Sequence, residues 1–230
     1  MMKPKPSFLF VVSTSGSLMN AVLGCASVRA ATHSAVFFGH GPGVEKASAH
    51  EVPCKIIKAT TIETFSNELL AYIRANEIDY VLSFFAGFFS KGFRDEMSDR
   101  LINFHPSLLP SFKGMDSFGD GVAYHTKILG TTVELIKDVM DEGKIVMQTA
   151  FASDPGLSVG RLRHVVFNQQ CKTLIQVVNW VQEGRVEIDG DRVTIRDANY
   201  DSTEFVPALE HPEAREFHVP FPGAVKVSDV

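Results

Sequence analysis

The sequence predicts an α/β fold: a mostly parallel, Rossmann-like sheet with helices on both faces, an antiparallel hairpin beside it, and an irregular C-terminal tail. Two patterns lead to this prediction. Up to about residue 110, short apolar runs alternate with segments of helical period, which is typical of the βαβ units that build a parallel sheet. Beyond residue 130, two strand-like runs follow each other across a short turn, which indicates an antiparallel pair.

Composition limits the classes of function. The chain has 230 residues, of which 45% are hydrophobic, and a formal charge of -5, so we expect a large buried core and no nucleic-acid partner. No apolar run reaches the roughly 18 residues that span a bilayer, and the run at 7–12 is too short for a signal peptide. We therefore expect a cytoplasmic protein without a membrane partner. The three cysteines fit neither a disulfide framework nor a metal site, so no metal is predicted.

The N-terminal half contains five predicted strands and three predicted helices. The strands are the apolar runs 8–12, 34–38, 54–57, 79–85 and one that ends near residues 101–105; the helices are 18–26, 44–50 and 61–75. Residues 86–93 form a predicted loop rich in Phe and Gly. This loop fits the wall of a pocket for a flat aromatic ligand and ordinary core packing equally well.

The C-terminal half contains the predicted hairpin and a long helix. Residues 111–121 are too glycine-rich for a helix, so a loop is predicted there, running into a short helix around 122–127. Strands are predicted at 130–136 and 144–152 around a turn at 137–143, then a helix at 158–180 capped by Ser158, then a hairpin of 185–188 and 192–195. These features predict one domain over 1–197, with its Rossmann-like part at about 1–110 and the active-site hairpin and long helix at about 111–197. A tail without clear period follows at 198–230.

The stretch 101–110 carries the strongest sign of chemistry. Alternation in an extended segment places Asn103 and His105 on the same face, and Pro106 keeps His105 extended where the strand ends. The carboxyl ends of such strands are where α/β sheets place ligands. Asp141 is a candidate partner, because a carboxylate orients an imidazole and favours its charged form. The alternative is an Asn and a His that satisfy turn backbone, with Asp141 a solvated turn residue.

A weaker signal lies after the first predicted strand. The polar turn 13–17 leads into a predicted helix, whose free backbone amides make a possible anion cradle. A single glycine, Gly16, makes this a weak phosphate motif by itself.

Residues 103–110, followed by Phe112-Lys113-Gly114, resemble the signature of folate-dependent formyltransferases, and most closely that of the phosphoribosylglycinamide (GAR) formyltransferases of purine biosynthesis. The resemblance continues through 86–88, 130–133, 141–143 and Gln148, and covers roughly residues 8 to 188.

The resemblance implies a formyltransferase fold and transfer of a formyl group from 10-formyltetrahydrofolate to an amine. It assigns Asn103 to stabilising an oxyanion, His105 to the same task when protonated or to proton transfer, and Asp141 to holding His105. The folate would bind largely through backbone groups of two loops, whose predicted contact residues are Phe88, Phe89, Ser90, Gly92, Ile136, Lys137 and Asp138.

The departures from the family pattern concern the second substrate. The residues expected to hold it are Ser15, Gly16, Ser17 and Gln170. Here the phosphate-binding turn lacks one glycine and an asparagine of the family, a family arginine near 60–64 has no counterpart, and Gln170-Cys171 replaces a Glu-His pair. Glu134 stands where the family carries His, and it is interpreted either as a partner for a cationic amine or as a solvated strand residue.

Several functions therefore remain open. The acceptor is GAR or a different amine, such as an amino sugar or an amino acid derivative. The alternatives are a hydrolase that passes the formyl group to water and a non-catalytic folate-binding protein. We expect a monomer or a homodimer.

Overall fold

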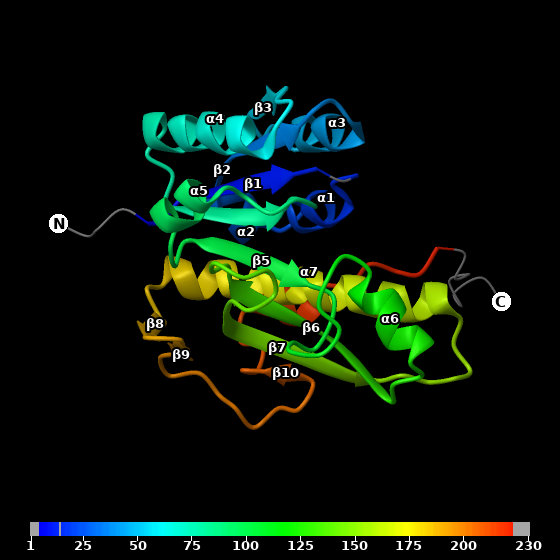
Figure 1. Cartoon of the computed structure of the whole chain (residues 1–230). Helices are drawn as coiled ribbons and strands as arrows, with labels where there is room; N and C mark the ends of the chain where they lie inside the picture. Colours follow the sequence, from blue (N-terminus) through cyan, green and yellow to red (C-terminus); the bar gives the residue numbers. More distant parts are fainter. Residues whose placement is uncertain (1–4, 14, 223–230) are drawn as a thin grey trace.

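The computed structural model describes residues 5–13 and 15–222, and an eight-stranded sheet forms its centre (Figure 1). Thr14 of the predicted polar turn and residues 223–230 of the predicted tail lie outside the described residues. The strand order is β10-β7-β6-β5-β4-β1-β2-β3. The strands of this sheet are β1 (Phe8–Val12), β2 (Thr32–Phe38), β3 (Cys54–Ile57), β4 (Tyr80–Phe84), β5 (Leu101–His105), β6 (Ile128–Leu135), β7 (Lys144–Ala152) and β10 (Phe205–Val206).

Strands β1 to β5 are parallel, and β6, β7 and β10 extend the sheet in antiparallel fashion. The predicted fold class is thereby confirmed. From β1 the chain moves to β2 and β3 on one side, and then returns to β4 and β5 on the other. Ligands of open α/β sheets bind beside such a reversal, at the carboxyl ends of the strands. A separate hairpin pairs β8 (Val186–Asp189) with β9 (Arg192–Ile195).

Helices cover both faces because β1 is apolar on both. Phe8 and Phe10 face one core, which α1, α2, α7 and α8 complete, whereas Leu9 and Val11 face a second core, completed by α4 and α5. The helices are α1 (Ser17–Val22), α2 (Ala26–Ala31), α3 (Pro42–Ala49), α4 (Ile62–Ala75), α5 (Lys91–Glu96), α6 (Ser117–Ala123), α7 (Val159–Gln182) and α8 (Pro212–Glu216). None of the described helices is long and apolar enough to cross a bilayer.

The single helix predicted at 18–26 is wrong, because the chain forms two short helices there, α1 and α2. Gly24 lies between them, and α2 begins with a cap from a distant segment. The Glu213 carboxylate accepts hydrogen bonds from the backbone N–H groups of Ala26, at 2.8 Å, and Ser27, at 3.0 Å. A carboxylate satisfies the free amides of a helix N-terminus and favours its dipole. Burial raises the pKa of Glu213, but the hydrogen bonds from Ser27 and Ala26 outweigh this effect, so its pKa lies below the usual value.

Two further predictions need correction. The predicted loop at 86–93 contains the start of α5, where the Ser90 hydroxyl caps the helix by accepting from Phe93 N at 3.4 Å. The short helix predicted at 122–127 instead spans 117–123, inside the stretch judged too glycine-rich. Phe118 is buried in a small core under α7, and this packing outweighs the low helix propensity of the glycines.

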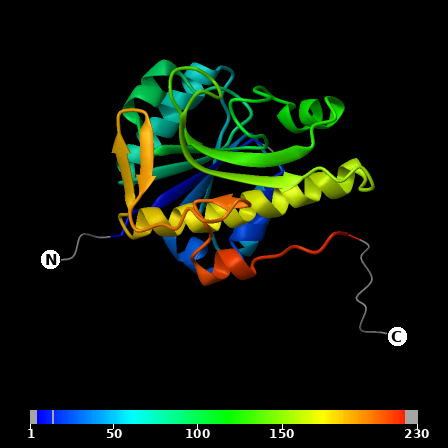
Figure 2. The ribbon, with the colours of Figure 1, turned by 90° about the horizontal axis from the view of Figure 1, so that it is seen from below.

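The tail folds back over the domain as far as it is described. Strand β10 pairs with β7, and α8 lies alongside α7 (Figure 2). The Glu210 carboxylate accepts from the indole N–H of Trp180 at 3.2 Å and pairs with Arg185 at 2.6 Å. Phe205 and Ala214 are buried in the same core as β1. The tail is therefore part of the core.

This packing predicts that the tail contributes to global stability. Phe205→Ala removes a ring that is 6% exposed and should lower the free energy of unfolding by about 3 kcal/mol, measured by urea denaturation. The adjacent Val206→Ala, at a side chain that is 37% exposed, is the matched control and should cost less than about 1 kcal/mol. Equal small effects of both variants would show that the tail is dispensable.

Candidate active site

The last strand of the parallel half, β5, carries Asn103 and His105 on one face of the sheet. Asn103 lies opposite Ser83 of β4 and Glu134 of β6, and His105 lies opposite Thr132. His105 is 5% exposed. The alternation expected from the sequence thus places both side chains at the carboxyl end of β5, one strand beyond the reversal in strand order between β1 and β4.

The His105 ring is held from both sides by hydrogen-bond acceptors. Nε2 lies 3.1 Å from the Phe112 carbonyl oxygen, and Nδ1 lies 3.3 Å from Oδ1 of Asp141. The side chains of His105 and Asp141 are each 7% exposed, so solvent screens this pair little. Carbonyl and carboxylate oxygens only accept, so each ring nitrogen faces an acceptor: Nε2 in a hydrogen bond and Nδ1 at ion-pair distance.

Phe112 and Asp141, the two residues whose oxygens face the His105 ring, have unusual backbone conformations. Phe112 has φ 54° and Asp141 has φ 57°, in the left-handed region that non-glycine residues rarely adopt. Such a conformation costs about 1–2 kcal/mol for each residue. The surrounding contacts must therefore offset the cost of these two strained conformations, which place two acceptors against the His105 ring.

Two loops meet above the ring. Oδ2 of Asp141 accepts from the backbone N–H of Gly114 at 2.6 Å, so one carboxylate contacts both His105 and the 111–116 loop. Beside it, Lys113 pairs with Glu142 at 2.6 Å. The lysine and glutamate side chains are 39% and 50% exposed, so their pair adds little stability.

The segment after His105 is fixed by buried polar contacts. The Thr132 hydroxyl is fully buried, donates to the Ser107 carbonyl at 2.8 Å and accepts from Leu109 N at 3.0 Å. The Ser107 hydroxyl lies within 3.0 Å of the Phe112 carbonyl, and Gln148 donates to the Leu109 carbonyl. These contacts set the position of the carbonyl that faces His105 Nε2.

Glu134 is buried, so the interpretation of it as a solvated strand residue is wrong. It is 1% exposed and faces the pocket from β6. Its Oε1 accepts from Asn103 Nδ2 at 2.9 Å and its Oε2 accepts from Gly143 N at 2.8 Å. The carboxylate contacts an amide of the candidate site.

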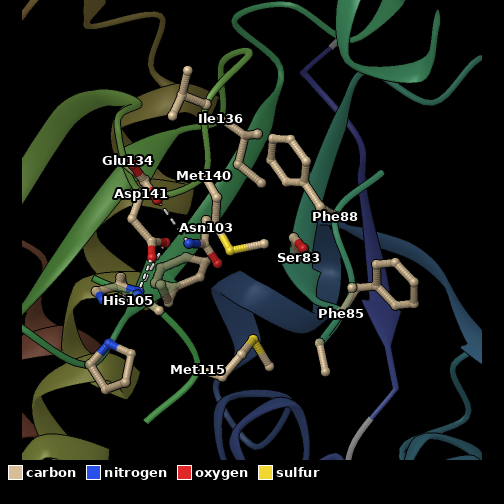
Figure 3. Close-up of a pocket in the computed structure, with 16 residues that line it drawn as sticks. Ser83, Phe85, Phe88, Asn103, His105, Met115, Glu134, Ile136, Met140 and Asp141 are labelled. Carbon is tan, nitrogen blue, oxygen red and sulfur yellow. Dashed lines mark hydrogen bonds and ion pairs between the residues drawn. The ribbon is translucent and has the colours of Figure 1, made fainter. Parts of the chain in front are cut away.

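A pocket of about 700 Å³, counting its open mouth, lies in front of these groups (Figure 3). Asn103, His105, Asp141 and Glu134 gather on one side, and Phe88 and Ile136 lie away from them. Small-molecule sites are typically apolar with a few convergent polar groups, and the lining of this pocket has that character. The lining residues are Ser83, Phe85, Ala86, Gly87, Phe88, Asn103, Phe104, His105, Pro106, Gly114, Met115, Glu134, Ile136, Val139, Met140 and Asp141.

Two of the seven residues predicted to contact folate, Phe88 and Ile136, line this pocket. The other five lie behind its wall or outside it. Phe89 is buried against Phe65, Phe85 and Phe93. Ser90 caps α5, and Gly92 lies in its first turn. Lys137 pairs with Asp191, and Asp138 lies 3.9 Å from Arg94. Their contact with folate stays a prediction.

The residues predicted to hold the second substrate lie in two places. Gly16, at φ 66°, leads into α1, and the hydroxyls of Ser15 and Ser17 lie 2.9 Å apart. Lys46, which the sequence did not single out, donates to the Ser15 carbonyl at 2.8 Å. On α7, Gln170 uses its side-chain nitrogen to donate to the Phe104 carbonyl at 2.8 Å.

Cys171, the neighbour of Gln170, is fully buried in the core. Burial raises the pKa of its thiol well above the usual value, which keeps the thiol neutral. Cys171 therefore serves as a core residue, and its buried, neutral thiol is not available to contact a substrate.

Sequence reasoning missed the lining residues Ser83, Phe85 and Met115. Val139 and Met140 also line the pocket; they lie in the 136–141 loop that was expected to flank the folate, but they were not named as contacts. Most of these residues are apolar, and a sequence pattern does not distinguish apolar residues that line a pocket from apolar residues that pack in the core. Met140 adjoins Asp141 and Met115 follows the Phe-Lys-Gly motif, so position next to a motif was the available signal. No group of three or more His, Cys, Asp or Glu side chains with the geometry of a metal site occurs among the described residues.

Comparison with known proteins gives the family. A family model described as "Formyl transferase" matches residues 7–178. The chain belongs to the formyl transferase family. The resemblance seen in the sequence is thereby confirmed, and the site described above lies within the matched segment.

Similar proteins include phosphoribosylglycinamide formyltransferases and a formyltetrahydrofolate deformylase. The phosphoribosylglycinamide formyltransferase of Escherichia coli (strain K12) is 25% identical over 202 residues, 81% of this chain and 95% of that protein. The formyltetrahydrofolate deformylase of Corynebacterium sp. (strain P-1) is 28% identical over 181 residues, 79% of this chain; the match covers 60% of the deformylase. Among structures, glycinamide ribonucleotide transformylase 1 from Symbiobacterium toebii superposes with a TM-score of 0.77 at 25% identity, covering 84% of this chain and 95% of that one.

The polar contacts after His105 predict a stability effect at Thr132. Thr132→Val keeps the shape but leaves the buried Leu109 amide without an acceptor, which should lower the free energy of unfolding by about 1–3 kcal/mol in urea denaturation. The control is Thr194→Val on β9, whose hydroxyl makes no hydrogen bond within the described part of the chain and should change stability by less than about 0.5 kcal/mol. A Thr132→Val protein as stable as the control would contradict this account.

Proposed function

We propose that this protein transfers a formyl group from 10-formyltetrahydrofolate to a primary amine. The observation that carries the proposal is the contact of Asp141 with the His105 ring, next to Asn103, at the end of a 700 Å³ pocket. In this arrangement the amide can donate to an oxygen that gains charge during acyl transfer, the imidazole can stabilise that charge, and the carboxylate holds the imidazole. Family membership and the names of its relatives support the same chemistry.

Each residue of the group has a distinct proposed task. In formyl transfer, the acceptor nitrogen bonds to the formyl carbon, the bond from that carbon to the folate nitrogen breaks, and one proton passes from the acceptor nitrogen to the folate nitrogen. Asn103 donates its free amide N–H to the formyl oxygen while that oxygen carries negative charge, and a positively charged His105 ring stabilises the same charge through space, because both ring nitrogens face protein acceptors. Asp141 lies against Nδ1 of the ring and holds the ring in its orientation.

The pocket suits a folate donor. Phe88, Ile136, Val139 and Met140 offer aromatic and apolar surface for a flat ring system, while the polar groups lie at one side. The lining also contains residues 86–88, the segment expected to contact a pterin through backbone groups. This fit supports the donor named in the formyltetrahydrofolate deformylase relative.

For the acceptor, the proposed class is a primary amine, and GAR is the named candidate. Within the described residues no Lys or Arg lines the pocket, and Gln170 is engaged with backbone. Beside the Ser15–Ser17 turn, the Lys46 ammonium contacts the Ser15 carbonyl and the Ser17 hydroxyl. A phosphate dianion needs several donors to offset its desolvation, so this weaker set of donors favours an amine without phosphate, such as an amino sugar or an amino acid derivative, as the alternative.

Hydrolysis of the donor is the second candidate function. It is favoured by the match to formyltetrahydrofolate deformylase, at 28% identity over 79% of this chain. The two functions share the donor and the polar group, and they differ in whether an amine or water attacks.

A turnover assay separates these functions. The protein is incubated with 10-formyltetrahydrofolate alone, with GAR, and with a panel of amino sugars and amino acid derivatives, and release of tetrahydrofolate is followed. Release that requires an amine supports the transferase, and release without an amine supports the hydrolase. Donor binding without turnover in any arm would reject both and leave a folate-binding protein.

The proposal predicts a strong effect of His105→Ala. Loss of the imidazole that faces Asp141 and stabilises the charged formyl oxygen should lower kcat by about 1,000-fold, while the Kd for the folate donor stays within about 3-fold. His33→Ala is the control, because His33 lies at the start of β2, away from the carboxyl ends of the strands, and it should retain full activity. A His105→Ala protein with near-normal kcat would remove His105 from the mechanism.

A further inference from the structure

Glu134 connects two parts of the candidate active site that are distant in sequence. It lies directly opposite Asn103 in the β5–β6 ladder, and a register shift between Val133 and Glu134 interrupts the β6–β7 pairing at this point. Its carboxylate is buried, and each oxygen has its own donor. Oε1 accepts from Asn103 at 2.9 Å, and Oε2 accepts from Gly143, two residues after Asp141, at 2.8 Å.

The first contact determines how Asn103 is oriented. An ionised carboxylate only accepts hydrogen bonds, so the amide of Asn103 must turn its nitrogen, not its oxygen, toward Glu134. One N–H of that nitrogen is used by Oε1, and the other stays available. Figure 3 shows Glu134 and Asn103 joined in this way on the side of the pocket that holds Asp141 and His105.

The second contact requires a close approach of the backbone. A Cβ at position 143 would lie 2.6 Å from Glu134 Oε2 and 2.3 Å from the Leu135 carbonyl oxygen, so only glycine fits here. The Gly143 N–H therefore reaches the carboxylate directly. This contact anchors the end of the loop that carries Asp141.

We propose that Glu134 is a positioning residue for formyl transfer: its carboxylate orients the Asn103 amide and anchors the Asp141 loop, so that both meet His105 in one geometry. This inference rests on the proposed function of the site. Glu134 stands where the family resemblance led us to expect a histidine. Its negative charge beside the pocket also disfavours an anionic group at that end, which agrees with an acceptor that lacks phosphate.

Glu134→Gln is a sharp test because glutamine cannot satisfy both donors. Its side chain has one oxygen, so either Asn103 or Gly143 faces the new NH₂ group and loses its acceptor. We expect kcat to fall about 10- to 100-fold, with KM for the folate donor within about 3-fold of wild type. Glu187→Gln, at an exposed site on β8, is the matched control and should leave kcat unchanged.

A double-mutant cycle separates positioning from a general loss of structure. In an Asn103→Ala background the amide is absent, so adding Glu134→Gln should lower kcat far less than it does in wild type. The same fold-loss in both backgrounds would overturn the proposal, as would a Glu134→Gln enzyme within 2-fold of wild type. Should Glu134→Gln fail to fold, Glu134→Asp keeps the charge but withdraws the oxygens by one methylene, and the same cycle applies.

A second readout does not depend on turnover. The side-chain amide signal of Asn103 in a ¹⁵N NMR spectrum, assigned as the signal lost in Asn103→Ala, should shift in Glu134→Gln and stay in place in Glu187→Gln. An unshifted signal would overturn the role of Glu134 even if the protein transfers no formyl group. Absence of wild-type turnover with a shifted signal would contradict the proposed function alone.

Discussion

The structure of the site depends on one constraint: the imidazole of His105 lies between two acceptors, the Asp141 carboxylate and the Phe112 carbonyl. Both contacts require backbone in the left-handed region, which non-glycine residues enter at a cost. The chain therefore stabilises these conformations from elsewhere. Gly114 donates to Asp141, and Ser107 lies against the Phe112 carbonyl. The result is a buried ring whose orientation is set before any substrate binds.

A second layer of polar contacts supports the first. Thr132 fixes the segment after His105, and Glu134, two residues further along β6, contacts Asn103 and Gly143. Buried polar groups of this kind are stable only when each has a partner, and here the Glu134 and Thr132 side chains do. Strand β6 therefore carries the groups that hold the site in place. The sequence pattern predicts this strand only as half of a hairpin.

Much of this architecture is predictable from local patterns. Alternation and Pro106 were enough to place Asn103 and His105 together at the end of β5, and apolar runs identified the parallel strands. Long-range contacts account for most of the rest. The start of α2 depends on Glu213, 187 residues away, and α6 depends on the burial of Phe118. The sequence pattern alone is compatible with a solvated Glu134, because the contacts with β5 and Gly143 that bury it form only in the folded chain.

The central claim is that Asp141 acts through the His105 ring in formyl transfer, and kcat of an Asp141→Asn variant tests it most directly. The amide keeps the size of the side chain but loses the charge that holds a protonated ring, so kcat should fall about 100-fold or more with unchanged donor affinity. Asp99→Asn, which removes a surface ion pair with Lys144 before the start of β5, is the matched control and should keep wild-type kcat. An Asp141→Asn enzyme as fast as this control would contradict the account.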